Sequence, residues 1–118
     1  MESYYLIIHL ILGPLMLVLS LVYKSFPPKS INMLYGYRTR SSMKSPEVWD
    51  ASNAYASNLM MWMSIATIAF QAAFHFLIES QANVILASTI ALTVLLIATI
   101  PLTEKFIKDN FDKEGKPL

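Results

Sequence analysis

The densest group of chemically versatile side chains lies in residues 35–58, which read YGYRTRSSMKSPEVWDASNAYASN. Arg38 carries a planar fork of donors that can bind a carboxylate or a lipid phosphate, or cap carbonyl groups at a helix end. Gly36 permits a backbone conformation that is closed to other residues. Alternatively, Arg38, Arg40 and Lys44 serve only as anchors at anionic lipid headgroups. The spacing of these residues leaves both interpretations open.

A second group of polar side chains lies within and just before an apolar run, residues 59–78. Its members recur at steps of three, four or seven, which places them on one face of a helix: Trp49, Asn53, Met60, Ser64, Thr67, Gln71 and His75. Such a face could receive a ligand or line the pathway of a small channel or transporter. It could also join helices through hydrogen bonds, and we favour this interpretation for Ser64 and Thr67.

His75 and Glu79 are four residues apart, a spacing that would bring them together near the end of that helix. The pair could respond to pH or supply two ligands to a metal ion. His9 is the only other histidine and the chain has no cysteine, so we predict no metal site and no cofactor.

The sequence also lacks the common catalytic motifs. It contains no HExxH, no GxSxG, no Walker loop and no paired carboxylates within an apolar run. We therefore expect no enzymatic activity, and an enzyme acting on lipid-linked substrates is kept only as a third alternative.

Three apolar runs must position these residues. Residues 4–23, 59–78 and 84–102 contain no Asp, Glu, Lys or Arg. As helices, runs of roughly 20 residues cross a hydrocarbon core of about 30 Å. The chain is 55% apolar and 14% charged, whereas soluble domains are about a quarter charged. The sequence predicts an all-α membrane protein: one three-helix domain over residues 1–118, with a loop at residues 24–58.

The cations predict the orientation of this domain. Five lie between the first two runs and four follow the third: Lys24, Lys29, Arg38, Arg40, Lys44, Lys105, Lys108, Lys113 and Lys116. Residues 1–3 and 79–83 contain none. Because Lys and Arg near helix ends favour the cytoplasm, we predict that the N-terminus lies outside and that both the loop and the C-terminus lie in the cytoplasm.

Local signals refine the predicted helix ends. Ser45 suits an N-cap, Pro46 the first helical position and Glu47 the positive end of the helix dipole. We therefore expect one helix from Pro46 to Ile78, extending about three turns into the cytoplasm. Gly13-Pro14 should kink the first helix. Residues 103–118 should continue the third helix briefly and then fray.

The loop motif resembles the signature of the SdpI family. In that family a G-[YIF]-R-T-x-x-[ST] segment lies between two membrane helices, followed by a Trp and then an Asn near the next helix. The residues that carry the resemblance are Tyr35, Gly36, Tyr37, Arg38, Thr39, Ser41, Ser42, Ser45, Glu47, Trp49 and Asn53. It implies a bacterial inner-membrane protein related to immunity factors against secreted toxic peptides. Some members also relay toxin presence to a cytoplasmic repressor, and the better understood ones carry additional helices ahead of this minimal domain.

On this resemblance we expect a non-enzymatic, multi-pass interaction protein of the inner membrane, acting in toxin immunity or signalling. The alternative is a small channel or transporter that uses the polar face of the second helix. The expected binding residues are Tyr35, Gly36, Arg38, Thr39, Ser42, Trp49 and Asn53, and the intramembrane polar residues are Gln71, His75 and Glu79. The expected partners are membrane lipids, a toxic peptide or a cytoplasmic regulator, and a second copy in a homo-oligomer. We expect no direct binding to nucleic acid.

Overall fold

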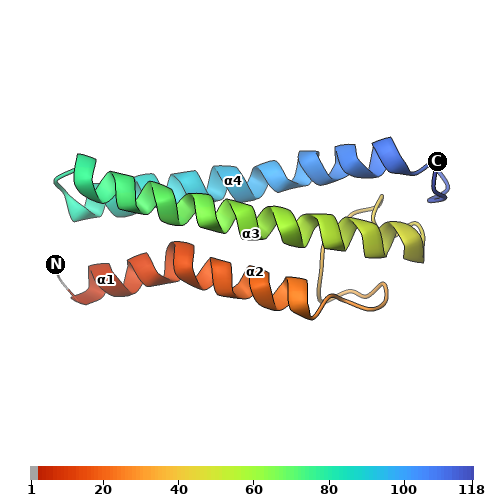
Figure 1. Cartoon of the computed structure of the whole chain (residues 1–118), viewed down its shortest axis with the longest axis horizontal. Helices are drawn as coiled ribbons and strands as arrows, with labels where there is room; N and C mark the ends of the chain where they lie inside the picture. Colours follow the sequence, from red (N-terminus) through yellow and green to blue (C-terminus); the bar gives the residue numbers. More distant parts are fainter. Residues whose placement is uncertain (1–2) are drawn as a thin grey trace.

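The first membrane helix is built from three consecutive segments in the computed structural model, which describes residues 3–118. They are α1 (Ser3–Leu10), a π-helical turn η1 (Ile11–Leu15) and α2 (Met16–Ser25). Pro14 lies inside η1. Because proline lacks an amide N–H and its ring crowds the preceding turn, the helix accommodates it by a π-turn. The irregularity predicted at Gly13-Pro14 therefore takes this form (Figure 1).

The second helix, α3 (Pro46–Leu77), has the N-terminus that its sequence predicts. The Ser45 hydroxyl accepts a hydrogen bond from the backbone N–H of Val48 at 3.2 Å, and Pro46 occupies the first turn. The 32 residues of α3 rise roughly 48 Å at 1.5 Å per residue, which exceeds a hydrocarbon core of about 30 Å. The helix ends one residue earlier than predicted, because the backbone of Ile78 is extended.

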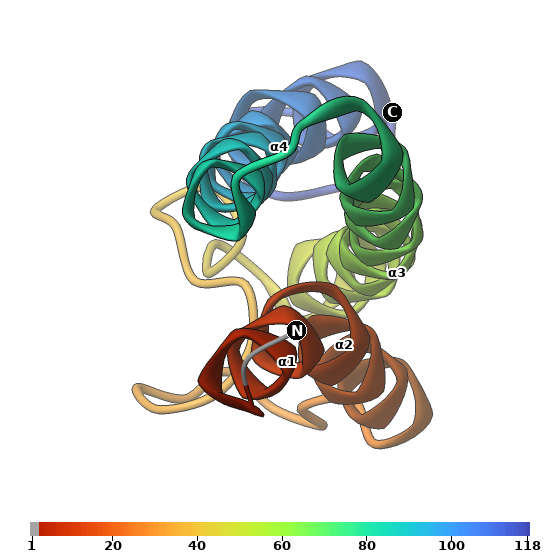
Figure 2. The ribbon, with the colours of Figure 1, turned by 90° about the vertical axis from the view of Figure 1, so that its left-hand side faces the viewer.

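The third helix, α4 (Gln81–Asn110), follows after a short turn. Ser80 caps it by accepting a hydrogen bond from the N–H of Asn83 at 3.4 Å. The helices run side by side along the longest axis, and α3 packs against both α2 and α4 (Figures 1 and 2). The all-α architecture is thus confirmed, with three helices long and apolar enough to cross a membrane.

Gly13 permits the close approach of the first two membrane helices. A Cβ atom at this position would lie 2.6 Å from Cγ1 of Ile68 in α3 and 3.2 Å from its backbone N. Glycine therefore lets η1 pack directly against the backbone of α3.

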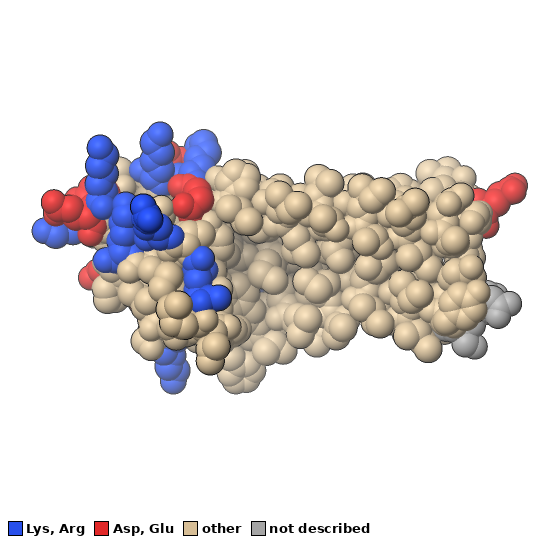
Figure 3. Space-filling model, turned by 180° about the vertical axis from the view of Figure 1, so that it is seen from behind, with Lys and Arg blue, Asp and Glu red and all other residues tan. Residues whose placement is uncertain are grey.

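Lys and Arg side chains gather at one end of the molecule, with loop 26–45 and residues 111–118 (Figure 3). We call this the basic end. The face of the helices shown in Figure 3 is otherwise free of charged side chains as far as the opposite end. This separation is what the orientation predicted from the cations requires, and the orientation itself remains a prediction.

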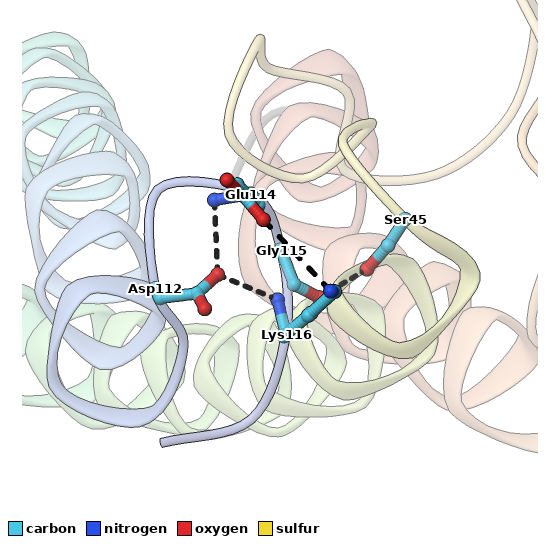
Figure 4. A network of polar contacts seen from close by, with 5 residues as sticks. All are labelled: Ser45, Asp112, Glu114, Gly115 and Lys116. Carbon is cyan, nitrogen blue, oxygen red and sulfur yellow. Dashed lines mark hydrogen bonds and ion pairs between the residues drawn. The ribbon is translucent and has the colours of Figure 1, made fainter.

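The chain after α4 forms a turn, so the prediction that it frays is wrong. The Asp112 carboxylate accepts hydrogen bonds from the backbone N–H groups of Glu114 and Lys116, both at 2.9 Å (Figure 4). These bonds, with that from Lys116 strongest, lower the pKa of Asp112 below its ordinary value. The Ser45 hydroxyl donates to the carbonyl of Gly115 at 2.6 Å. The tail is thereby tied to the first turn of α3.

Candidate functional site

The side chain of Asn53 in α3 is the centre of the hydrogen bonds that hold the loop. It is 1% exposed. Its Oδ1 atom accepts a hydrogen bond from the backbone N–H of Tyr37 at 2.6 Å and another from the phenol of Tyr23 in α2. Its Nδ2 group donates to the carbonyl of Trp49 at 2.9 Å. A single amide thus connects α2, α3 and the loop.

Trp49 anchors the start of the loop one turn earlier on α3. Its side chain is fully buried, and its indole Nε1–H donates to the carbonyl of Pro28 at 3.0 Å. A buried indole whose N–H is hydrogen-bonded contributes both apolar packing and a directional contact that fixes the position of the loop. The Trp and Asn of the motif are therefore successive contacts on one face of α3.

Gly36 is required by both its backbone angle and its surroundings. Its φ is +110°, a region that residues with a Cβ rarely adopt. A Cβ would lie 2.6 Å from Oδ1 of Asn53 and 2.7 Å from Cγ of Pro28. The glycine therefore lets the loop backbone pass between these two groups.

Thr39 and Ser42 close a reciprocal turn in the middle of the loop. The N–H of Thr39 donates to the Ser42 hydroxyl at 2.8 Å, and the N–H of Ser42 donates to the Thr39 hydroxyl at 3.1 Å. The buried Ser42 hydroxyl also lies 3.0 Å from the carbonyl of Tyr37. The T-x-x-S spacing of the motif is explained by this turn.

Glu104 of α4 binds the other side of the loop. Its Oε2 accepts hydrogen bonds from the Tyr37 phenol at 2.6 Å and from the Thr39 hydroxyl at 3.0 Å. Burial, and then the neighbouring Glu104 carboxylate, raise the pKa of Tyr37 above its ordinary value of 10.0, so the phenol remains a neutral donor. The loop therefore joins all three membrane helices.

Tyr23 and Glu104 are two residues of the site that were not predicted from the sequence. Glu104 is the first charged residue after the third apolar run, and Tyr23 is the last residue of the first run. Each is thus a polar group at the basic end of its helix, which is the only signal that the sequence offers. Nothing local to either residue indicates that it faces the loop.

Replacing Glu104 with alanine should lower the free energy of unfolding by about 1–3 kcal/mol, because two loop hydroxyls lose their shared acceptor. Denaturation by sodium dodecyl sulfate in mixed micelles would measure the change. Asp109→Ala on the same helix is the matched control. Its exposed pair with Lys105 contributes little, and equal effects of the two variants would contradict the role of Glu104.

Arg38 differs from the buried members of the motif. Its side chain is exposed, and Nη1 donates to the carbonyl of Met33 within the loop. Tyr35 is also at the surface, where its hydroxyl donates to the carbonyl of Phe26 at 2.7 Å. The motif therefore divides into residues that hold the loop in place and an arginine that the loop presents to its surroundings.

Hydrogen bonds of the polar face of α3 stay largely within the protein. The Ser64 and Thr67 hydroxyls donate to the carbonyls of Met60 and Met63 on their own helix, at 2.7 and 2.9 Å. Gln71 Nε2 donates to the carbonyl of His9 in α1 at 3.0 Å. The hydrogen bonds across helices that we expected for Ser64 and Thr67 are therefore wrong, and of these three residues only Gln71 bonds to another helix. Buried groups with partners inside the protein still favour packing over a conducting pathway.

The expected pairing of His75 with Glu79 is wrong. Because α3 ends at Leu77, Glu79 lies beyond the helix and the four-residue spacing no longer sets its position. Both side chains are exposed, and the ion pairs among residues 3–118 do not include them. His75, His9 and Gln71 do share one cavity of about 360 Å³ between α1 and α3. Within the described chain, no cluster of three or more His, Asp or Glu could hold a metal ion.

The fold and the loop define a multi-pass membrane protein whose three spanning helices are closed at one end by a hydrogen-bonded motif loop. Residues 29–103 match the model of the SdpI/YfhL protein family, and the chain belongs to that family. At the family level it is therefore a membrane immunity-type protein. The resemblance noted in the loop motif is thus confirmed.

One relative in Bacillus subtilis (strain 168) carries the description "Uncharacterized protein YfhL". It is 37% identical to this chain over 103 residues, which cover 87% of this chain and 88% of the relative. No solved structure gives a significant match.

Proposed function

We propose that this protein protects a bacterial cell from a secreted, membrane-active toxic peptide and acts from the inner membrane. The proposal rests on one observation: in a chain that belongs to an immunity-type family, the family's loop motif is held by hydrogen bonds across all three helices. We call the hydrogen-bonded loop residues 35–42, with Tyr23, Asn53 and Glu104, the cap. A loop held in this way can present a fixed surface to a partner. A non-enzymatic role is supported by the use of its polar groups, whose hydrogen bonds lie within the cap.

Arg38 is the residue through which we propose that the loop acts. The buried groups of the cap already have partners within the protein, whereas the exposed guanidinium uses one N–H group on the carbonyl of Met33. A guanidinium has five donors in a planar fork, so it can also bind a carboxylate or phosphate. The partner at this end would be the peptide itself or a cytoplasmic regulator, and the homo-oligomer predicted from the sequence is part of the same proposal.

Replacing Arg38 with alanine should abolish protection. Producing the wild-type chain in a sensitive strain should raise the tolerated concentration of a membrane-active peptide. Loss of a charge-assisted hydrogen bond, about 1.5–3 kcal/mol, should lower that concentration roughly tenfold or more. Survival curves at matched protein levels would measure this.

Arg40→Ala is the control for charge, because Arg40 is also an exposed cation of the loop. We expect it to retain protection. Full protection by the Arg38 variant would contradict this site, and no protection by the wild-type chain against any member of a peptide panel would contradict the function.

A further inference from the structure

A cavity of about 410 Å³ opens between the membrane helices beside the motif loop. Leu19 and Val22 of α2 line one side, Thr99 of α4 the other, and Met60 of α3 the floor, while loop residues 35–37 close it at the basic end. Figure 2 shows α2 and α4 apart on one side of α3, and Figure 3 shows the surface recessed beside the gathered cations. The cavity therefore faces laterally, toward the bilayer.

The wall of this cavity is apolar because its hydroxyl groups already have acceptors. The Thr99 hydroxyl donates to the carbonyl of Leu96 at 2.6 Å, and the Tyr35 hydroxyl donates to the carbonyl of Phe26. The phenols of Tyr23 and Tyr37 donate to Asn53 and Glu104. None of these four hydroxyl groups is left as a donor for a polar ligand, and most of the wall is apolar side chain, so the matching occupant is a hydrocarbon chain.

Two cations directly follow, in the chain, residues that line the cavity. Lys24 follows Tyr23 directly in the chain, and Arg38 follows Tyr37, both of which line the cavity. Both cations are exposed, and neither takes part in an ion pair within residues 3–118. Lys24 lies in the last turn of α2, a position at the level of the lipid headgroups, and Arg38 belongs to the loop that closes the cavity at the same end. Cations at this level attract anionic lipids.

From this arrangement we infer that the cavity binds one anionic phospholipid, with an acyl chain between α2 and α4 and the phosphate at Lys24 and Arg38. Charge complementarity at the closed end selects this occupant over an uncharged one. An acyl chain is surrounded by hydrocarbon both in the bilayer and in the cavity, so its transfer contributes little free energy beyond improved packing. The preference for an anionic headgroup comes from the two cations. The inference shares Arg38 with the proposed immunity site, but it does not depend on immunity.

A bulky side chain placed inside the cavity should weaken lipid binding. The full-length protein in detergent would be titrated with fluorescent phosphatidylglycerol, and separately with phosphatidylcholine carrying the same fluorophore. Wild type should bind the first more tightly, and Thr99→Phe should weaken that binding at least tenfold. Thr93→Phe is the matched control, because Thr93 lies on the exposed surface of the same helix. Equal binding by the two variants would overturn the assignment.

Removing the positive charges of Lys24 and Arg38, which we call the rim cations, should reduce the preference for the anionic lipid. At about 1 kcal/mol per cation, Lys24→Gln with Arg38→Gln should reduce the preference for phosphatidylglycerol over phosphatidylcholine roughly 30-fold. The matched control is Lys105→Gln with Lys108→Gln, which removes two exposed cations of α4. An unchanged preference in the rim variant would contradict the role of these two cations.

A third measurement needs no variant and therefore cannot fail through misfolding. Phosphatidylglycerol with a photoreactive acyl chain, reconstituted with the wild-type protein, should label Val22 and Met60 more than Val94 and Ile97 on the exposed face of α4. Even labelling would overturn the site. So would the absence of lipid adducts at Met60, because the cavity would then hold something other than this lipid. Loss of lipid binding in Thr99→Phe with protection retained would separate this site from the proposed immunity.

Discussion

Replacing Asn53 with alanine is expected to lower the free energy of unfolding by about 3–5 kcal/mol. The change removes the closest acceptor of the Tyr37 N–H, which keeps only the Tyr23 hydroxyl at 3.2 Å, and the acceptor of the buried Tyr23 phenol. A buried donor left without a partner costs roughly 1–3 kcal/mol, and the weakened Tyr37 bond and a small cavity add to the loss. Unfolding in denaturing detergent, monitored by circular dichroism, would measure the difference in free energy.

Asn58→Ala provides the matched control, since Asn58 lies on the same helix with an exposed side chain. Its effect should stay within about 0.5 kcal/mol, as for most surface substitutions. Asn53→Asp retains an acceptor but loses the Nδ2 donor, so its loss of stability should fall between those of Asn53→Ala and Asn58→Ala. An Asn53→Ala variant as stable as Asn58→Ala would show that the amide does not hold the loop.

Replacing Gly36 with alanine should lower the free energy of unfolding by about 2–4 kcal/mol. A backbone at φ +110° is strained for any residue with a Cβ, which costs about 1–3 kcal/mol. The added methyl would also lie 2.6 Å from the Asn53 oxygen, so that the loop must shift. The same denaturation experiment would measure the loss, and limited proteolysis would show whether the loop has detached.

The control for Gly36 is Ser30→Ala, another change to alanine at an exposed position of the loop. It should leave both stability and proteolysis unchanged. If Gly36→Ala were as stable and as resistant as Ser30→Ala, the close passage of the loop beside Asn53 would be wrong. Helix content should be retained in either variant, because α2 and α3 form their own backbone hydrogen bonds.

The helices were predictable from the sequence because their causes are local. Three apolar runs of membrane-crossing length require helices, since lipid offers no partner for backbone polar groups. Ser45 and Pro46 start α3 through contacts that span only a few residues. The loop motif was also evident from residue types, and the family match confirmed it. The division of charge between the loops supports an orientation that remains a prediction.

The partners in the site could be decided only by tertiary structure. Asn53 meets Tyr23 across 30 positions of the chain, and Thr39 meets Glu104 across 65. Such contacts depend on which face each helix turns toward its neighbours, and no local pattern sets this. The same reason explains why the tail folds onto Ser45, and why α3 ends before Glu79, so that the four-residue helical spacing from His75 no longer applies. Local chemistry determined the helices and the motif, and the packing of three helices determined what the motif holds.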